Sequence, residues 1–252
     1  MKYDKLGSRM KSFYEEIPRT RLIRRIPVAI HLDGRSFHTF TKNFEKPFDK
    51  VLHTAMNLTT KHLCENIQGC VLGYTQSDEI TLILIDLNTD AWFNYEVQKM
   101  CSISASMATF AFNRIFGEMV SRYHEPSDIP VTPAHLEACK KGATFDSRCF
   151  NIPREEVTNL IYWRQQDAIR NSVQQVAQAY FPHSQLLNKN ILQVKDLLLK
   201  EKRISWNDFP IQYQRGVCCI KDSNGWHLDT SIPVFIGENR KYIECLIKPE
   251  EE

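Results

Sequence analysis

The fold of this chain depends on residues 70–85, which read Cys70-Val-Leu-Gly-Tyr-Thr-Gln-Ser-Asp-Glu-Ile-Thr-Leu-Ile-Leu-Ile85. Residues 70–76 predict a strand, Ser77 and Asp78 predict a turn, and residues 80–85 predict a second strand that is apolar almost throughout. An apolar run of this kind is typical of a strand that is buried on both faces of its sheet. The stretch therefore predicts a buried β-hairpin with acidic residues at its tip.

The segments on either side extend this hairpin into a larger α+β unit. In chain order, the further expected elements are a strand at 27–33, a helix at 47–68, a helix at 94–117 and a strand at 144–152. With the hairpin, the order is β-α-β-β-α-β, the ferredoxin-like arrangement that also forms the palm of many polymerases and nucleotide cyclases. The first and third strands of that arrangement are antiparallel neighbours, so we expect Asp33 to lie beside Asp78 and Glu79.

The second half of the chain is expected to be mainly helical. The elements expected there are helices at 155–181 and 190–202 and short strands at 216–221, 226–228 and 242–248. We therefore expect residues 1–150 to form a palm-like catalytic region with a basic N-terminal arm. Residues 151–252 are expected to form a helical and short-strand region that packs on the palm and contacts the substrate, within one continuous globular unit.

Composition places the chain among ordinary globular proteins. It has 252 residues, of which 42% are hydrophobic and 25% are charged, and this is enough material for a large core. No run is long enough to span a bilayer, and the N-terminus lacks the apolar core of a signal peptide, so we expect a cytoplasmic protein without a membrane partner. Eight cysteines without a Cys-x-x-Cys pair favour reduced, buried thiols, and a zinc or redox site at Cys218 and Cys219 is the open alternative.

Positive charge is concentrated near the N-terminus. The net charge is +2, yet residues 1–50 hold twelve Lys and Arg against six Asp and Glu. Much of the excess precedes Asp33, and cationic side chains near carboxylates suit a polyanionic substrate. Charge alone does not separate this interpretation from a solvated, salt-bridged arm.

Three acidic residues are the strongest candidates for chemistry: Asp33, Asp78 and Glu79. Mg²⁺ prefers carboxylate oxygens and keeps several waters that substrate phosphates replace. Three acids packed together repel one another unless a cation is present. Taken singly, each acidic motif is compatible with an ordinary polar turn, but their expected meeting in space favours a site for two Mg²⁺ ions in phosphoryl transfer.

Basic and glycine-containing segments flank these acids. Gly34 lets backbone N–H groups approach phosphate closely, and His38 either contacts a triphosphate or packs on neighbouring phenylalanines. Lys46 either reaches a phosphate as a point charge or remains a solvated loop lysine. Arg164 and Asp167 lie three residues apart on an expected helix, where they either pair or leave the arginine for a nucleic-acid backbone.

Five motifs in combination resemble the tRNA-His guanylyltransferase family, and more closely its bacterial and archaeal Thg1-like branch of 3′–5′ polymerases. The resemblance extends roughly from residue 5 to residue 220. The motifs are Leu32-Asp-Gly-Arg-Ser-Phe-His38, Phe44-Glu-Lys-Pro47, Gly73-Tyr-Thr-Gln-Ser-Asp-Glu79, Phe145-Asp-Ser-Arg148 and Trp163-Arg-Gln-Gln-Asp167.

The resemblance implies an enzyme that adds nucleotides to the 5′ end of tRNA, opposite in direction to ordinary polymerases. A 5′-monophosphate end is first adenylylated with ATP. The 3′-hydroxyl of an incoming GTP or other NTP then attacks that end and releases AMP, while a 5′-triphosphorylated end skips the activation. The resemblance also implies two Mg²⁺ ions and assembly as a homotetramer.

Particular residues receive roles from the same resemblance. The metal ligands would be Asp33, Asp78, Glu79 and the main-chain carbonyl of Gly34, and the three acids are also the catalytic residues. The nucleotide-binding residues would be Gly34, Arg35, Ser36, Phe37, His38, Lys46 and Ser77. The residues that face tRNA would be Lys99, Arg148, Arg164 and Arg215.

Three departures from the family pattern bear on the substrate. Ile169-Arg-Asn-Ser172 replaces a His-Ile-Asn-Asn stretch of the eukaryotic enzymes, and Asn94-Tyr-Glu96 replaces a basic Lys-Arg-Arg cluster. Both changes favour template-directed repair of 5′-truncated tRNAs over dedicated addition of one guanosine to tRNA-His. His31 stands where many members have arginine, so a positive charge is lost there or becomes pH-dependent.

Three other functions stay open at this point. The first is dedicated tRNA-His guanylyltransferase activity, and the second is a palm-type nucleotidyl cyclase or nucleotidyltransferase that needs no RNA. The third is a non-catalytic RNA-binding protein on a decayed palm, and the presence of all three acids argues against it.

Overall fold

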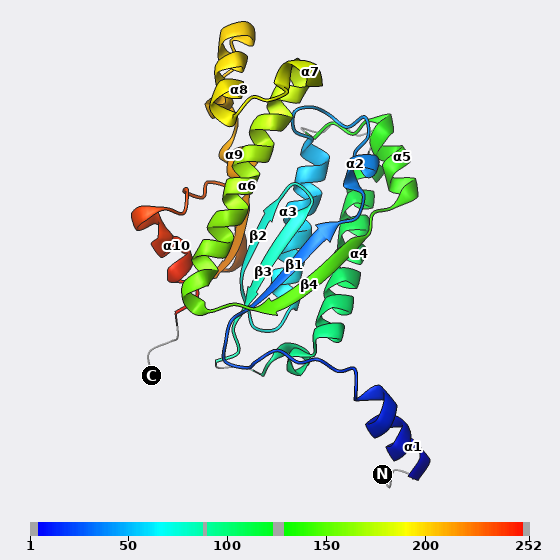
Figure 1. Ribbon diagram of the computed structural model, residues 1–252. Coiled ribbons are helices and arrows are strands. Elements are labelled where there is room, and N and C mark those ends of the chain that lie inside the picture. Colours follow the sequence, from blue (N-terminus) through cyan, green and yellow to red (C-terminus); the bar gives the residue numbers. More distant parts are fainter. Residues whose placement is uncertain (1–4, 88–89, 123–128, 249–252) are drawn as a thin grey trace.

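The computed structural model describes residues 5–87, 90–122 and 129–248 and has a six-stranded antiparallel sheet at its centre (Figure 1). The order of the strands across the sheet is β4-β1-β3-β2-β5-β6. The strands are β1 (Val28–Gly34), β2 (Cys70–Gln76), β3 (Glu79–Leu84), β4 (Phe145–Asn151), β5 (Val217–Asp222) and β6 (Gly225–Asp229). The chain is therefore of the mixed α+β class that the sequence predicts.

The predicted hairpin forms β2 and β3, with Ser77 and Asp78 as its turn. Ser77 has a φ of +53°, a left-handed conformation that tight hairpin turns require. β1 pairs antiparallel with β3, which confirms that the first and third strands are neighbours. This pairing sets Asp33 opposite Glu79 and thereby places the predicted site at one end of the sheet.

Two long helices cover one face of the sheet. They are α3 (Lys50–Asn66) and α4 (Val97–Ser121). Alternate residues of β1, namely Val28, Ile30 and Leu32, are fully buried on this face. The first helix begins later than predicted because Asp49 caps it, with a side-chain oxygen that accepts the Leu52 N–H at 2.9 Å.

A third long helix, α6 (Arg154–Tyr180), lies on the opposite face of the sheet (Figure 1). It shares a second buried cluster with alternate residues of the central strands. That cluster includes Ala29, Leu72, Tyr74, Ile83, Val157 and Ile161. The helix leaves β4 uncovered on this side, where Phe150 remains 38% exposed. One part of this face of the sheet is therefore open to ligands.

Shorter helices fill the connections between these elements. They are α1 (Lys5–Met10), η1 (Lys11–Glu15), α2 (Phe37–Phe40), η2 (Trp92–Tyr95), α5 (Pro133–Lys141), α7 (His183–Leu186), α8 (Ile191–Leu197), η3 (Leu198–Lys202), η4 (Trp206–Asp208), α9 (Ile211–Arg215), η5 (Gly237–Arg240) and α10 (Lys241–Glu244), where η marks a 3-10 or π-helical turn. The helical segment predicted at 190–202 forms α8 and η3, which project beyond the end of the sheet (Figure 1). In the parts of the chain that the structure describes, no helix is long and apolar enough to cross a bilayer.

The strand predicted at 242–248 is wrong. Helix α10 runs to Glu244, and the chain continues in turns to residue 248. Tyr242, Ile243, Leu246 and Ile247 recur at the spacing of one helix face, and all four pack on the cluster beneath α6. Their β-branched and aromatic character favoured a strand, but helical spacing is what lets them share one buried side.

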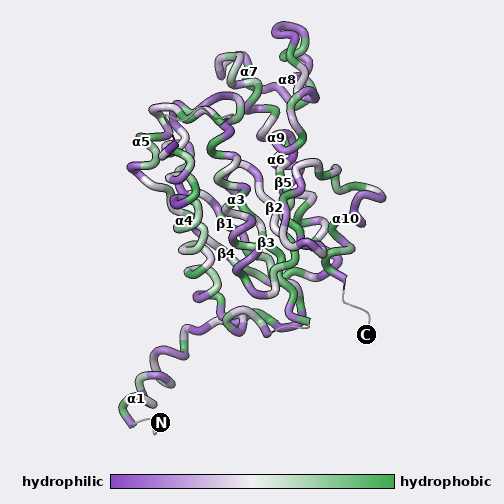
Figure 2. Tube along the Cα trace, turned by 180° about the vertical axis from the view of Figure 1, so that it is seen from behind, coloured by the Kyte–Doolittle hydropathy of each residue, from purple (hydrophilic) through white to green (hydrophobic). Residues whose placement is uncertain are grey.

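The N-terminal arm, α1 and η1, projects away from the body of the protein (Figures 1 and 2). No residue of these two elements is buried, and Leu6, Phe13 and Tyr14 expose 56%, 62% and 64% of their surface. The arm therefore presents apolar side chains that its own chain does not cover.

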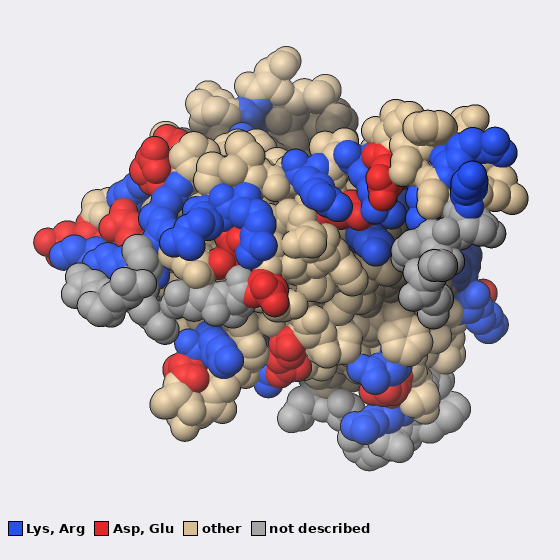
Figure 3. Space-filling model, turned by 90° about the horizontal axis from the view of Figure 1, so that it is seen from below, with Lys and Arg blue, Asp and Glu red and all other residues tan. Residues whose placement is uncertain are grey.

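The basic residues after the arm partly pair with acids. Arg24 Nε lies 3.0 Å from Asp86 Oδ2, and Arg19 Nε lies 3.9 Å from Glu96 Oε2. Seen from below, Lys and Arg side chains are interspersed with Asp and Glu on the described surface (Figure 3). The charge excess of this segment is thus partly neutralised, as the salt-bridged alternative requires.

Gln165 is fully buried and ties α6 to the C-terminal segment. Its Nε2 donates to the Pro233 carbonyl at 2.8 Å, and its Oε1 accepts the Phe235 N–H at 3.0 Å. Gln165→Ala leaves both backbone groups without this partner, so we expect the free energy of unfolding to fall by about 2–4 kcal/mol. Urea unfolding measures the change. Gln166→Ala, which loses only a surface bond to Tyr162, should cost less than about 0.5 kcal/mol, and equal losses would contradict this role.

Candidate active site

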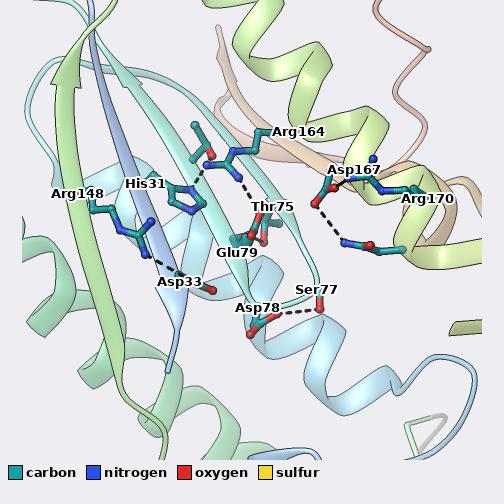
Figure 4. Close-up of polar contacts among 12 residues, drawn as sticks. His31, Asp33, Thr75, Ser77, Asp78, Glu79, Arg148, Arg164, Asp167 and Arg170 are labelled. Carbon is teal, nitrogen blue, oxygen red and sulfur yellow. Dashed lines mark hydrogen bonds and ion pairs between the residues drawn. The ribbon is translucent and has the colours of Figure 1, made fainter. Parts of the chain in front are cut away.

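Three carboxylates form a row across the sheet at one end of the central strands. Asp33 in β1 stands opposite Glu79 in β3 on one side and opposite Asp146 in β4 on the other. The Gly34 N–H donates to the Asp78 carbonyl at 3.1 Å, which ties the end of β1 to the hairpin turn. Topology therefore brings Asp33, Asp78 and Glu79 to one place (Figure 4). The pairing of β1 with β4 adds Asp146 beside Asp33.

Burial raises the pKa of all three predicted catalytic carboxyls. At Asp33, burial is the largest cause and the Asp146 charge adds to it. At Asp78 and Glu79, burial again comes first, and the Asp33 charge raises both pKa values further. A divalent cation would favour the ionised form of such a cluster. No three His, Cys, Asp or Glu side chains among the described residues are already arranged as a metal site, so the fit to Mg²⁺ rests on donor chemistry.

Two arginines contact the row of acids (Figure 4). Arg148 Nη2 lies 3.2 Å from Asp146 Oδ1 and 4.0 Å from Asp33 Oδ2. Arg164 Nη1 lies 3.4 Å from Glu79 Oε2. The arginines therefore balance part of the negative charge and add cationic groups that an anionic substrate can reach.

The pairing of Arg164 with Asp167, which the sequence left open, does not form. Asp167 pairs with Arg170 and accepts from Asn171 Nδ2 at 3.2 Å (Figure 4). The Arg164 guanidinium instead lies 4.4 Å from the centre of the Trp163 ring and reaches toward the acids. Its contact with the site was not evident from helical spacing alone.

His31 lies on the same face of β1, two residues before the first acid. It is 4% exposed, and its Nδ1 lies 3.4 Å from Thr81 Oγ1. Burial, followed by the charges of Arg164 and Arg148, lowers the pKa of His31 to about 4. The imidazole is therefore neutral at physiological pH. The sequence left open whether the positive charge at this position is lost or pH-dependent, and the lowered pKa favours its loss.

A cavity of about 550 Å³ opens beside the acids. The residues that line it near the acids include Asp33, Gly34, Ser36, Phe37, His38, Lys46, Ser77 and Asp78. His38 and Lys46 are exposed there, so neither is a core residue. Arg35 is outside this lining, and its N–H donates to the Thr144 carbonyl at 2.9 Å. The structure thus gathers six of the seven predicted nucleotide-binding residues around one cavity.

Aromatic and amide side chains line the other end of the same cavity, and sequence reasoning missed them. The Phe48 and Tyr213 rings are stacked with centroids 4.9 Å apart, and the His53 ring lies 4.6 Å from Tyr213. Burial lowers the pKa of His53 to about 4, against an opposing hydrogen bond with Gln212. The buried His53 Nε2 has no hydrogen-bond partner in the described part of the chain. The only sequence signal for this end of the cavity was the position of His53 next to Leu52, which belongs to an apolar stripe of the predicted helix.

A family model described as Thg1, tRNAHis guanylyltransferase, matches residues 7–153. This chain belongs to the tRNA(His) guanylyltransferase family. The matched range contains β1 to β4 and hence every acid of the row. The predicted family, and with it the predicted enzyme class of nucleotidyltransferase, are confirmed.

Two solved structures resemble this family member over nearly its whole length. A bacterial tRNA(His) guanylyltransferase (Thg1)-like protein in complex with ATP has a TM-score of 0.84 and 42% identity, covering 96% of this chain and 99% of that chain. A bacterial Thg1-like protein in complex with GTP has a TM-score of 0.77 and 38% identity, covering 97% of this chain and 99% of that chain.

Two of the curated relatives come from a virus and from a yeast. The uncharacterized protein R259 of Acanthamoeba polyphaga mimivirus is 31% identical, with 86% of this chain and 77% of that protein covered. The tRNA(His) guanylyltransferase of Schizosaccharomyces pombe is 26% identical, with 86% of this chain and 84% of that protein covered. The similarity therefore extends well beyond the acidic motifs.

The family resemblance implies four basic residues that face tRNA, and the structure places them in different surroundings. Arg148 and Arg164 contact the acids. Arg215 ends α9 beside β2, where its carbonyl accepts the Tyr74 hydroxyl at 2.8 Å and its buried Nε has no partner among the described residues. Lys99 lies near the start of α4, at the end of the sheet where β1 begins (Figure 1). Within one chain, Lys99 is therefore not brought to the acids.

A smaller recess of about 240 Å³ also borders the hairpin turn. Ser77 and Asp78 line both cavities, whereas Glu79 lines the smaller one. Helix α6 contributes the amide side chains of Asn171 and Gln174 to this recess. Asn171 belongs to the window in which the sequence departs from the eukaryotic family pattern. The two cavities therefore meet at the hairpin turn.

Proposed function

We propose that this family member is a Mg²⁺-dependent 3′–5′ nucleotidyltransferase that adds nucleotides to the 5′ end of tRNA in template-directed repair of 5′-truncated tRNAs. The observation that carries the proposal is the row of carboxylates at the polar end of a cavity of about 550 Å³. That volume lies within the range of small-molecule sites in proteins. Similar bacterial proteins form complexes with ATP and with GTP, which supports both nucleotides as substrates.

The proposed reaction has two nucleotidyl-transfer steps. An oxygen of the RNA 5′-monophosphate attacks the α-phosphorus of ATP, which yields an adenylylated 5′ end and pyrophosphate. The 3′-hydroxyl oxygen of an incoming NTP then attacks the RNA 5′-phosphorus, a phosphodiester bond forms, and AMP leaves. The protein's tasks are positioning and charge stabilisation. Lys46, His38 and the backbone of residues 34–38 would bind the triphosphate.

The carboxylates would also hold the metal. Asp33, Asp78, Glu79 and the main-chain carbonyl of Gly34 offer only oxygen donors, which Mg²⁺ prefers. The pKa of each of the three carboxyls is raised, so a bound cation would relieve their repulsion. Two Mg²⁺ ions supply charge neutralisation at the attacking and leaving oxygens.

We assign the reaction to a ferredoxin-like palm within residues 1–150, made of β1 to β4 with α3 and α4. The part of the chain from 151 to 252 adds β5 and β6 to the same sheet and would contact tRNA. A homotetramer belongs to the proposal, and the exposed apolar side chains of the N-terminal arm support an additional protein contact.

The aromatic end of the large cavity would take the nucleobase. Phe48 and Tyr213 offer flat rings for stacking, and the neutral His53 ring packs on Tyr213. With the phosphates at the carboxylates and the base at these rings, one NTP would occupy the cavity lengthwise.

His53→Ala is expected to weaken the binding of ATP and GTP about tenfold and to leave the binding of inorganic tripolyphosphate unchanged. The difference arises because the variant removes contacts at the base end alone. Isothermal titration calorimetry with Mg²⁺ measures both ligands. His62→Ala, on the same helix but outside the cavity, is the matched control. A parallel loss of tripolyphosphate binding would show that His53 supports the structure and does not contact the base.

Lys46→Ala is expected to slow activation of 5′-monophosphorylated tRNA about tenfold or more and to slow extension of 5′-triphosphorylated tRNA less than about threefold. The lysine would stabilise the charge that develops on the triphosphate of ATP during activation. For the incoming NTP it would contribute to binding only, and saturating NTP conceals that loss. Single-turnover assays on the two RNAs measure the two rates. Lys50→Ala, an exposed lysine outside the cavity lining, is the control. Equal losses on both RNAs would count against this role.

The proposed function is tested with a 5′-truncated tRNA labelled at its 3′ end, NTPs and Mg²⁺. Extension by nucleotides complementary to the opposite strand supports repair. One guanosine added whatever the opposite nucleotide would indicate dedicated tRNA-His guanylyltransferase activity. A cyclic nucleotide formed without RNA would indicate a cyclase, and would overturn the proposal.

A further inference from the structure

Helix α5 contacts both loops that line the polar end of the large cavity. Its third residue, His135, is fully buried, and His135 Nε2 lies 2.9 Å from Asp49 Oδ2 in the loop before α3. Beyond the other end of α5, the Thr144 carbonyl accepts the Arg35 N–H at 2.9 Å in the loop after β1. Helix α5 and the residues just after it therefore bridge two loops that are remote from them in sequence.

Hydrogen bonds determine which nitrogen of His135 faces Asp49. The Thr132 N–H donates to His135 Nδ1 at 2.8 Å, so Nδ1 is an acceptor and carries no proton. The ring proton is therefore on Nε2, which donates to the Asp49 carboxylate. One nitrogen caps the first turn of α5, and the other nitrogen holds the neighbouring loop.

Asp49 closes the loop that carries Lys46. Its Oδ2 accepts the Glu45 N–H at 3.1 Å in addition to the His135 bond, and its Oδ1 accepts the Leu52 N–H at 2.9 Å. Burial alone would raise the pKa of Asp49, but the bond from His135 and the backbone N–H bonds lower it below its ordinary value. The carboxylate is thus ionised at neutral pH, and Lys46 stands exposed between two tied ends of the loop.

Aromatic packing fixes the other end of the same loop. The Phe44 ring lies 4.4 Å from the His135 imidazole and is stacked on Phe116 of α4 at 6.1 Å. The beginning of the loop at Phe44 and its end at Asp49 therefore contact one and the same histidine. A substitution of His135 therefore removes contacts on both sides of Lys46 in the loop.

We infer that His135 is a positioning residue for nucleotide binding, which holds the Lys46 loop in place beside the carboxylates from helix α5. The inference rests on the proposed function, because it takes the triphosphate to be what Lys46 contacts. His135 does not line the cavity and acts through Asp49 and Phe44. Its loss should therefore weaken nucleotide binding and leave the chemical step nearly unchanged.

Two substitutions separate the two ends of the imidazole. His135→Gln places an amide N–H near the position of Nε2 and keeps the bond to Asp49, whereas His135→Asn places a carbonyl oxygen near the position of Nδ1 and keeps only the bond from Thr132. We expect His135→Asn to raise the KM for NTP about tenfold with kcat changed less than about twofold, and His135→Gln to stay within about threefold of the wild-type KM. His183→Asn, at an exposed position of α7, is the matched control.

A double variant checks that the effect passes through Asp49. Asp49→Asn should weaken GTP binding about as much as His135→Asn, and the double variant should bind no more weakly than either, because the same bond is already broken. Additive losses would place the effect of His135 outside this bond and contradict the inference.

Titration of GTP with Mg²⁺ in the absence of RNA keeps this test separate from the proposed function. An unchanged GTP Kd in His135→Asn, whether or not the melting temperature falls, would overturn the inference and leave the His135 bond a purely structural one. If the wild type fails to extend RNA while the GTP Kd still distinguishes the Asn variant from the Gln variant, the proposed function fails and the positioning role stands.

Discussion

Asp78→Asn is expected to abolish 5′ extension, with a fall in rate of about a thousandfold or more. The substitution keeps the shape of the side chain and removes the negative charge. Asp33→Asn should have the same effect, since the two acids meet at the end of β1 and the hairpin turn. Because both proposed steps use the same carboxylates, activation of a 5′-monophosphate and addition to a 5′-triphosphate should be lost together.

Two separate assays check that joint loss. The adenylylated RNA is quantified after incubation with ATP alone, and nucleotide addition is measured on RNA that already carries a 5′-triphosphate. Asp208→Asn, an exposed acid outside both cavities, is the control. Normal adenylylation in a variant that cannot add nucleotides would refute a shared set of carboxylates.

Gly34→Ala is expected to lower both nucleotide affinity and stability. A Cβ atom on Gly34 would lie 2.5 Å from Phe37 Cε2 and 2.8 Å from its Cγ. The Phe37 ring cannot yield easily, because its centroid lies 5.5 Å from that of Phe112 and 5.2 Å from that of Phe145. We expect an overpacking cost of about 2–3 kcal/mol in unfolding free energy and, since the loop must move with the ring, a loss of GTP affinity of about tenfold or more.

Thermal unfolding and GTP titration measure the two effects of Gly34→Ala. Gly117→Ala is the matched control, because its added Cβ would meet only Cys139 Sγ, at 3.8 Å, and alanine favours the interior of α4. The control should be as stable as the wild type or more so. A Gly34→Ala protein with normal GTP affinity would show that the loop adjusts without disturbing the cavity.

The central part of the fold was predictable because its signals are local and strong. A few consecutive residues are enough to predict each of three features: the apolar run of β3, the turn at Ser77 and Asp78, and the strand that ends at Asp33. The antiparallel pairing of the first and third strands then follows from the order of the elements, and with it the register that sets Asp33 opposite Glu79.

Other parts of the site were beyond the reach of the sequence because they depend on contacts between distant segments. His53 and Tyr213 meet across most of the chain, and neither residue lies in a motif. His135 reaches Asp49 from a helix that the sequence did not predict, and the bond depends on where that helix is packed. At Ile243 the local composition was misleading, since burial of one helix face decided the structure there.

The turn between β2 and β3 consists of two residues, Ser77 and Asp78. Gln76 faces Glu79 across the ladder, so two residues are all that separate the paired ends. Side chains alternate between the faces of a sheet, so a slip of β3 by one residue against its neighbours would turn Glu79 toward the helices behind it. An extra residue in this turn should therefore cost catalysis wherever it makes β3 slip or moves Asp78 away from the end of β1.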